Sequence, residues 1–133
     1  MLFEYKIQTR YSDSAQDGII HHSSFVIYLE EARLAFFKIV GLDINQIEKQ
    51  KMLIPVTELS VKYLKPLFSS EEIVVKVFVG SFSKIRFALE YQIFRKDLCV
   101  ATAVTVNCLL NQAFKPIPLS KVIVDHLEKF SLV

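Results

Sequence analysis

One helix constrains the fold of this chain more than any other feature. Apolar residues recur at steps of three and four from Phe25 to Val40, and others widen the stripe until only four charged residues break it. A helix that is apolar around most of its girth should be buried on most sides. Gly41 follows it, and a glycine there predicts a left-handed cap that ends the helix. The rest of the chain must therefore supply a surface that wraps around this helix.

The segments on either side of the helix have the patterns of β-strands. Residues 2–11 alternate between apolar and polar side chains, which predicts a strand with one solvated face. Residues 43–51 predict a short polar helix, and residues 119–130 predict a final amphipathic helix. Between them lie four runs rich in β-branched and aromatic residues, and these are 54–65, 72–83, 84–96 and 98–110. This order predicts the α+β class, with an antiparallel sheet wrapped around the long central helix.

Composition limits the classes of function. The 133 residues fit a single domain spanning 1–133, and the 52% hydrophobic content suggests that a subunit interface covers some apolar surface. No uncharged apolar run approaches roughly 18 residues, so we expect no membrane span. The alternating N-terminus does not resemble a signal peptide, so we expect a cytoplasmic protein. A net charge of +2 does not suggest nucleic-acid binding, but it suits an anionic small molecule.

The loop before the helix concentrates groups that transfer protons. It holds two carboxylates, Asp13 and Asp17, and two adjacent histidines, His21 and His22. Such a loop at a helix N-terminus can hold and polarise a carbonyl group, because the helix amides favour negative charge. Either histidine could also serve as a base near neutral pH. No cysteine or further histidine lies nearby with ligand spacing, so we expect no metal site.

Three segments carry a recognisable set of motifs. The first reads RYSDSAQDGIIHHSSF from Arg10 to Phe25 and continues as YLEEAR from Tyr28 to Arg33. The others are VKYLKP, at Val61–Pro66, and the turn Asn111–Pro118. Together they resemble the hotdog fold, specifically the 4-hydroxybenzoyl-CoA thioesterase-like acyl-CoA thioesterases, over nearly the whole chain.

That resemblance implies the activity and the assembly. It implies hydrolysis of an acyl-CoA or acyl carrier protein thioester to the free acid and thiol. It implies no cofactor, and a homodimer that is often paired into a homotetramer. Neither the acyl chain nor the choice between CoA and carrier protein follows from the motifs.

One position departs from the family pattern. In these thioesterases the second Asp of an Asp-x-Asp pair is the catalytic carboxylate, and here that position is Ala15. An alanine can act neither as a nucleophile nor as a general base. Either a neighbouring carboxylate replaces it, or the mechanism differs, or the chain is a non-catalytic acyl-CoA-binding protein.

The resemblance and the loop chemistry give four predicted catalytic residues. The main-chain amide of His22 matches the family position that polarises the thioester oxygen. Asp17, beside the flexible Gly18, is the favoured substitute for the missing carboxylate, and Asp13 is the second candidate. Glu58 lies in an apolar strand run and could position a water molecule. The predicted substrate-binding residues are Gly18, His21, Ser24 and Tyr63.

A serine is expected at the start of the helix as its cap. Ser23 or Ser24 is expected to cap it rather than to act as a nucleophile, because a hydroxyl oxygen can accept a free backbone N–H.

A hydratase or dehydratase is an alternative function, because some hotdog members pair a loop histidine with a helix carboxylate. His22 with Glu30 or Glu31 loosely resembles that pair.

Overall fold

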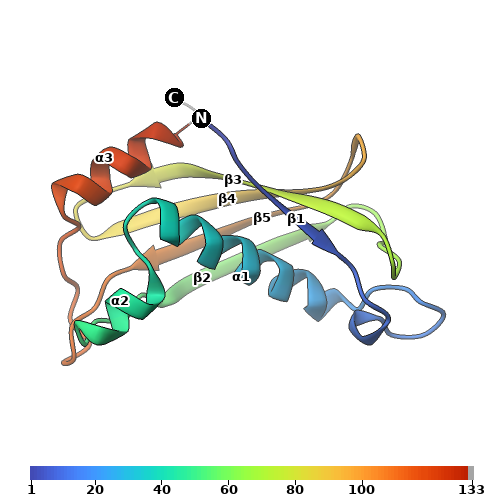
Figure 1. Cartoon of the computed structure of the whole chain (residues 1–133), viewed down its shortest axis with the longest axis horizontal. Helices are drawn as coiled ribbons and strands as arrows, with labels where there is room; N and C mark the ends of the chain where they lie inside the picture. Colours follow the sequence, from blue (N-terminus) through green and yellow to red (C-terminus); the bar gives the residue numbers. More distant parts are fainter. Residues whose placement is uncertain (132–133) are drawn as a thin grey trace.

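Five antiparallel strands form one sheet in the computed structural model, which describes residues 1–131 (Figure 1). The sheet order is β1–β3–β4–β5–β2, and the long helix α1 lies across one face. The strands are β1 (Phe3–Gln8), β2 (Val56–Tyr63), β3 (Glu72–Phe82), β4 (Arg86–Arg95) and β5 (Leu98–Cys108). The helices are η1 (Tyr11–Asp13), α1 (His22–Ile39), α2 (Ile44–Lys49) and α3 (Lys121–Lys129). The predicted architecture is confirmed.

The core lies between α1 and the face of the sheet that α1 covers, which we call the inner face. Alternate residues of β3 and β4 point to this face because side chains of a strand alternate between its two sides. The residues of β3 and β4 that are buried on this face are Ile73, Val75, Val77, Val79, Phe87, Leu89, Tyr91 and Ile93. The buried apolar residues of α1 are Phe25, Tyr28, Leu29, Ala32, Phe36 and Phe37. Burial of this apolar surface supplies most of the stabilisation of the fold.

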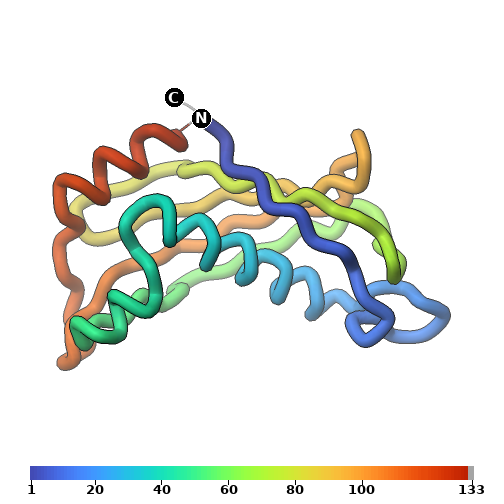
Figure 2. The backbone as a smooth tube through the Cα atoms, in the orientation of Figure 1, coloured from blue at the N-terminus to red at the C-terminus, as the bar shows by residue number. Residues whose placement is uncertain are grey.

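α1 lies closer to one edge of the sheet than to the other. Its backbone packs mainly against β3 and β1, and Figure 2 traces the chain from β1 through a loop into α1. At the opposite edge the inner face of β2 stays open, with Leu59 44% and Tyr63 46% exposed. Ile27 and Ile39 of α1 are also exposed. The prediction that α1 is buried on most sides is therefore wrong for the side of the helix that carries Ile27 and Ile39. The described residues form a single sheet, and this sheet covers only one side of α1.

The ends of the elements follow local chemistry. Gly41 has a φ of +87°, and the N–H of Leu42 donates to the carbonyl of Phe37 at 2.8 Å, which confirms the predicted cap of α1. The turn between β3 and β4 comprises residues 83–85. A bulge between Val79 and Ser81 adds one residue to β3 before this turn.

Candidate active site

A hairpin loop links the first strand to α1. Ser14 and Ile20 face each other across it, and the amide of Ala15 donates to the carbonyl of Ile19 at 2.7 Å. Asp17 and Gly18 form its tip with φ values of +58° and +74°. A glycine adopts this left-handed region freely, so it allows the tight reversal that returns the chain to the helix. The hairpin thereby delivers His21 to the start of α1.

His21, rather than a serine, caps α1. Its Nδ1 accepts the backbone N–H of Ser23 at 3.1 Å and lies 2.7 Å from the hydroxyl of the same residue. The predicted cap at Ser23 or Ser24 is wrong, because both residues lie inside the first turn. The hydroxyl of Ser24 instead donates to the carbonyl of Asp13 at 2.8 Å. Within residues 1–131 the amide N–H of His22 donates to no protein acceptor, so it can bind a ligand.

The cap gives a first prediction about stability. Replacing His21 by Ala removes the acceptor for the Ser23 amide and should lower the free energy of unfolding by about 1 kcal/mol. Replacing His21 by Asn supplies a side-chain oxygen at the same place and should restore most of that loss. Urea unfolding of the two variants at neutral pH measures the difference. Equal loss in both variants would show that the imidazole stabilises the loop in some way other than capping.

A cavity of about 310 Å³ opens beside the start of α1. Its lining residues are Ile20, His22, Phe25, Tyr63, Leu64, Lys65 and Pro66. Tyr63, the last residue of β2, donates its hydroxyl to the carbonyl of His22 at 2.9 Å. Its ring packs edge-on against Phe25, with centroids 5.0 Å apart. The predicted residues His22 and Tyr63 thus meet at one cavity, and Lys65, one of several cations that could meet substrate phosphates, lines it as well.

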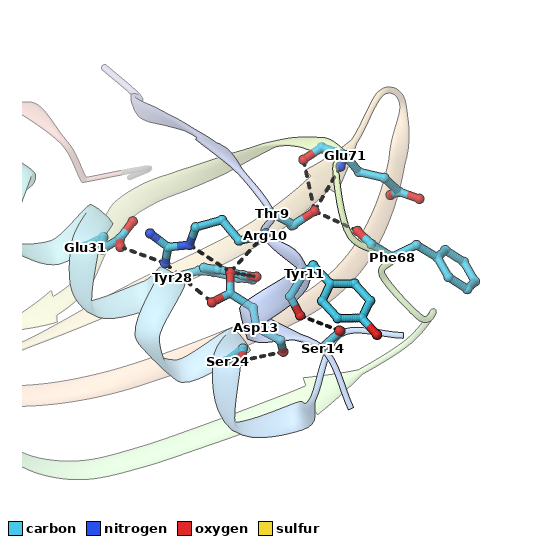
Figure 3. A network of polar contacts seen from close by, with 10 residues as sticks. All are labelled: Thr9, Arg10, Tyr11, Asp13, Ser14, Ser24, Tyr28, Glu31, Phe68 and Glu71. Carbon is cyan, nitrogen blue, oxygen red and sulfur yellow. Dashed lines mark hydrogen bonds and ion pairs between the residues drawn. The ribbon is translucent and has the colours of Figure 1, made fainter. Parts of the chain in front are cut away.

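Asp13 lies in a network of polar contacts beneath the hairpin (Figure 3). Its carboxylate accepts the Tyr28 hydroxyl at 2.8 Å, and from Arg10 it accepts the backbone amide at 3.1 Å and Nε at 3.3 Å. Arg10 also reaches Glu31 at 3.8 Å. Burial by itself raises the pKa of Asp13, but the hydrogen bonds from Tyr28 and Arg10 outweigh it and lower the pKa below its ordinary value. The Asp13 carboxylate therefore ties the loop before α1 to the helix through Tyr28 and Arg10.

The network gives a second prediction about stability. Replacing Asp13 by Asn removes the charge that Arg10 and Tyr28 stabilise, and should lower the free energy of unfolding by about 1.5–3 kcal/mol at pH 7. Because the folded-state pKa of Asp13 is lowered, its contribution is complete above the unfolded pKa of about 3.9 and is lost as pH falls through the folded value. Denaturation at pH 7 and pH 3 measures this. Asp17→Asn, at the exposed loop tip, is the matched control and should change stability little.

The other predicted catalytic carboxylates lie apart from the cavity. Asp17 is exposed at the hairpin tip, and neither it nor Asp13 lines the cavity. Glu58 pairs with Val106 on the outer face of the sheet, whereas its neighbour Leu59 pairs with Thr105 on the inner face. The four residues proposed from the sequence are therefore not brought together. Of the predicted binding residues, Gly18, His21 and Ser24 shape the loop and the helix start, and Tyr63 lines the cavity.

Two features of residues 1–131 bear on other functions. Nowhere in this range do three or more potential ligand side chains of His, Cys, Asp or Glu gather as a metal site would require. None of the helices in the same range is long and apolar enough to cross a membrane.

Comparison with known families identifies the chain. A family model described as the thioesterase-like superfamily matches residues 10–127, which include the hairpin, α1 and the whole sheet after it. The chain belongs to this superfamily. The resemblance to hotdog-fold acyl-CoA thioesterases is thereby confirmed, and the sheet wrapped on α1 is the hotdog fold.

Individual relatives of this thioesterase-like protein agree with that assignment. It is 32% identical to a DHNA-CoA thioesterase from Staphylococcus aureus, with a TM-score of 0.85 over 96% of this chain and 87% of the other. It is 26% identical to the protein TT1821 from Thermus thermophilus, with a TM-score of 0.88 over the full length of both chains. It is also 28% identical over 110 residues to a 1,4-dihydroxy-2-naphthoyl-CoA hydrolase from Microcystis aeruginosa, covering 81% of this chain and 80% of the relative.

Proposed function

We propose that this protein hydrolyses an acyl-CoA or acyl carrier protein thioester to the free acid and thiol. The observation that carries the proposal is the unpaired amide of His22 at the N-terminus of α1, on the rim of an apolar cavity. A thioester oxygen that accepts this N–H becomes more negative in the transition state, and the helix dipole stabilises that charge. Membership of the thioesterase-like superfamily supports the same reaction.

The group that activates water is proposed to be the His22 imidazole. Among the side chains that line the cavity, those that can exchange a proton belong to His22, Tyr63 and Lys65, and no carboxylate is among them. An imidazole is a suitable base near neutral pH, whereas a tyrosine hydroxyl and a lysine ammonium hold their protons there. In this scheme Lys65 supplies positive charge at the mouth of the cavity, where it attracts the phosphates of an anionic substrate.

A second candidate function is binding of acyl-CoA without turnover. Ala15 at the position of the family's catalytic Asp favours it, as does the engagement of Asp13 with Tyr28 and Arg10. The experiment that separates the two candidates is release of free thiol from a panel of acyl-CoA thioesters, with binding measured in parallel by calorimetry. Turnover with any member supports hydrolysis. Tight binding with no thiol released supports the binding protein, and water addition to an enoyl-CoA in the same panel would support a hydratase.

We also propose that the protein is a homodimer that joins at the β2 edge and can pair further into a homotetramer. The inner face of β2 exposes Leu59 and Tyr63, and β2 is an edge strand with unpaired backbone groups. Leu59→Lys should therefore halve the mass of the dimer in light scattering, because a buried charge opposes association. Val122→Lys, which replaces an exposed apolar residue on α3, should leave the mass unchanged. Unchanged mass in both variants would place the interface elsewhere.

A further inference from the structure

The connection between β2 and β3, residues 64–71, forms one wall of the cavity beside His22. Its first three residues, Leu64, Lys65 and Pro66, line the cavity, and Lys65 is the one lysine or arginine among the lining residues. The side chain of a lysine is flexible, so the backbone from which it extends sets the space that its ammonium can reach. The place of this wall therefore decides how the positive charge lies relative to the His22 amide.

The wall begins on β5 and then leaves the sheet. The backbone amides of Leu64 and Lys65 both donate to the carbonyl of Val100, at 2.9 Å and 3.1 Å. Pro66 follows, and a proline has no N–H with which to continue the pairing of β2 with β5. Beyond this point the position of the connection depends on contacts other than those of the sheet.

Arg95, the last residue of β4, bridges the two ends of this connection. Its Nη1 donates to the carbonyl of Pro66 at 2.8 Å and to Oε2 of Glu71 at 3.3 Å. Among residues 1–131 no backbone N–H donates to the Pro66 carbonyl, so the guanidinium supplies its protein donor. The side chains of Arg95 and Glu71 are each 25% exposed, so salt screens this ion pair less than one on the open surface. A guanidinium carries several donors in fixed directions, which lets it serve both acceptors at once.

Other contacts hold the second half of the connection to the hairpin. The hydroxyl of Thr9 donates to the carbonyl of Phe68 at 2.6 Å and accepts the backbone N–H of Glu71 at 2.9 Å (Figure 3). The backbone N–H of Ile20 donates to the carbonyl of Leu67 at 2.8 Å. The hairpin thus fixes the half that lies away from the cavity, and the guanidinium contact holds the half that lines it.

From these contacts we propose that Arg95 is a positioning residue, which holds the wall so that the Lys65 ammonium meets the phosphates of a bound thioester. The inference rests on the proposed function, because that function places the thioester carbonyl at the His22 amide and the phosphates at the mouth of the cavity. Arg95 touches no substrate in this scheme and acts through Lys65. Loss of its contacts releases the wall, and a displacement of about 1 Å is enough to weaken such a geometry strongly.

The test measures the Kd of two non-hydrolysable thioether analogues with the same acyl group. One is an acyl-CoA analogue, and the other is an acyl-pantetheine analogue, which lacks the nucleotide and every phosphate. The ratio of the pantetheine Kd to the CoA Kd reports the phosphate contact, which a purely structural loss would not change. Lys65→Met should lower this ratio about tenfold, the size of one charged contact. Arg95→Met should lower it nearly as much, and the double variant should lower it no further than Lys65→Met alone, because one residue acts through the other.

Three further variants separate the position of the wall from the charge of the molecule. Arg95→Lys keeps a donor and a positive charge, and should restore most of the ratio. Lys96→Met removes the same charge at the next, exposed position and should leave the ratio unchanged. Glu71→Ala removes a negative charge, so a general charge effect would raise the ratio, whereas a released wall lowers it. Glu71→Ala also replaces Arg95→Met if thermal unfolding shows that the latter does not fold.

The same measurements distinguish failure of this inference from failure of the proposed function. An unchanged ratio in Arg95→Met, additive falls in the double variant, or an equal fall in Lys96→Met would each overturn the positioning role. An unchanged ratio in Lys65→Met would overturn it as well, and all four results leave hydrolysis standing. Binding of both analogues without thiol release from any acyl-CoA would overturn hydrolysis, while the ratio still decides the role of Arg95. A natural protein that binds neither analogue and releases no thiol would overturn both.

Discussion

Replacing His22 by Pro should abolish most of the thioester hydrolysis while leaving α1 intact. The substitution removes the amide N–H that has no protein acceptor, together with the imidazole that is proposed to activate water. Proline is well tolerated at the first position of a helix, and His21 before it has the extended backbone, with a ψ of 143°, that proline requires. Loss of one such donor to a developing oxyanion lowers kcat by about 10²–10³.

His22→Ala is the matched control for this variant. It removes the imidazole as Pro does, but it keeps the amide, so the ratio between the two variants isolates the main-chain donor. We expect His22→Ala to retain clearly more activity than His22→Pro, and thiol release under single-turnover conditions measures both. Circular dichroism and thermal unfolding verify the helix. Equal activity in the two variants would mean that the His22 amide does not bind the thioester oxygen.

Replacing Ala15 by Asp should raise the rate of thioester hydrolysis. The resemblance to the family predicts a catalytic carboxylate at position 15, and here that position is an exposed alanine in the hairpin that leads to His22. A well-placed general base contributes about 10²–10⁴ in rate, so a rise of roughly 10² in kcat with little change in KM is the expected result. The rise in rate should depend on ionisation of the introduced carboxyl group, and it should disappear as the pH falls below the ordinary carboxyl pKa of about 3.9.

Ala15→Asn is the control that separates charge from shape. It has nearly the same size as Asp and can make similar loop hydrogen bonds, but it cannot accept a proton. If Asn raised the rate as much as Asp, the gain would come from a rearranged hairpin. If neither substitution changed the rate, the base would have to come from elsewhere, which the proposed role of His22 allows. Activity that appears only with Asp would support the reading of the natural protein as an acyl-CoA binder.

The fold could be predicted from the sequence because its signals are local and repeated. The apolar steps along α1, the alternation in β1 and Gly41 each report a backbone conformation that neighbouring residues enforce. The position of His22 at the helix N-terminus came from the resemblance to the thioesterase family, because the local signals placed the cap at Ser23 or Ser24. The single-domain organisation, the cytoplasmic location and the catalytic roles of individual carboxylates stay predictions.

The placement of the carboxylates could not be predicted in this way. A bulge between Val56 and Glu58 shifts the register of β2, and a shift of one residue turns a side chain to the other face of a sheet. Glu58 consequently faces outward, and alternation counted from Val56 would have placed it inside. Asp13 accepts a hydrogen bond from Tyr28, which lies fifteen positions later and two turns into α1. No local sequence pattern indicates the orientation of Glu58 or the hydrogen bond of Asp13.

The amino-acid sequence by itself determined a long apolar helix, a loop rich in proton-transfer groups before it, and enough strands to enclose one side of it. Only the tertiary structure decided that His21 caps the helix, that the His22 amide stays unpaired, and that Tyr63 lines the cavity beside it. The physical reason is the range of the forces involved. Backbone conformation depends on adjacent residues, whereas a cavity depends on segments such as His22 and Tyr63, which are forty-one positions apart and meet only after the sheet has formed.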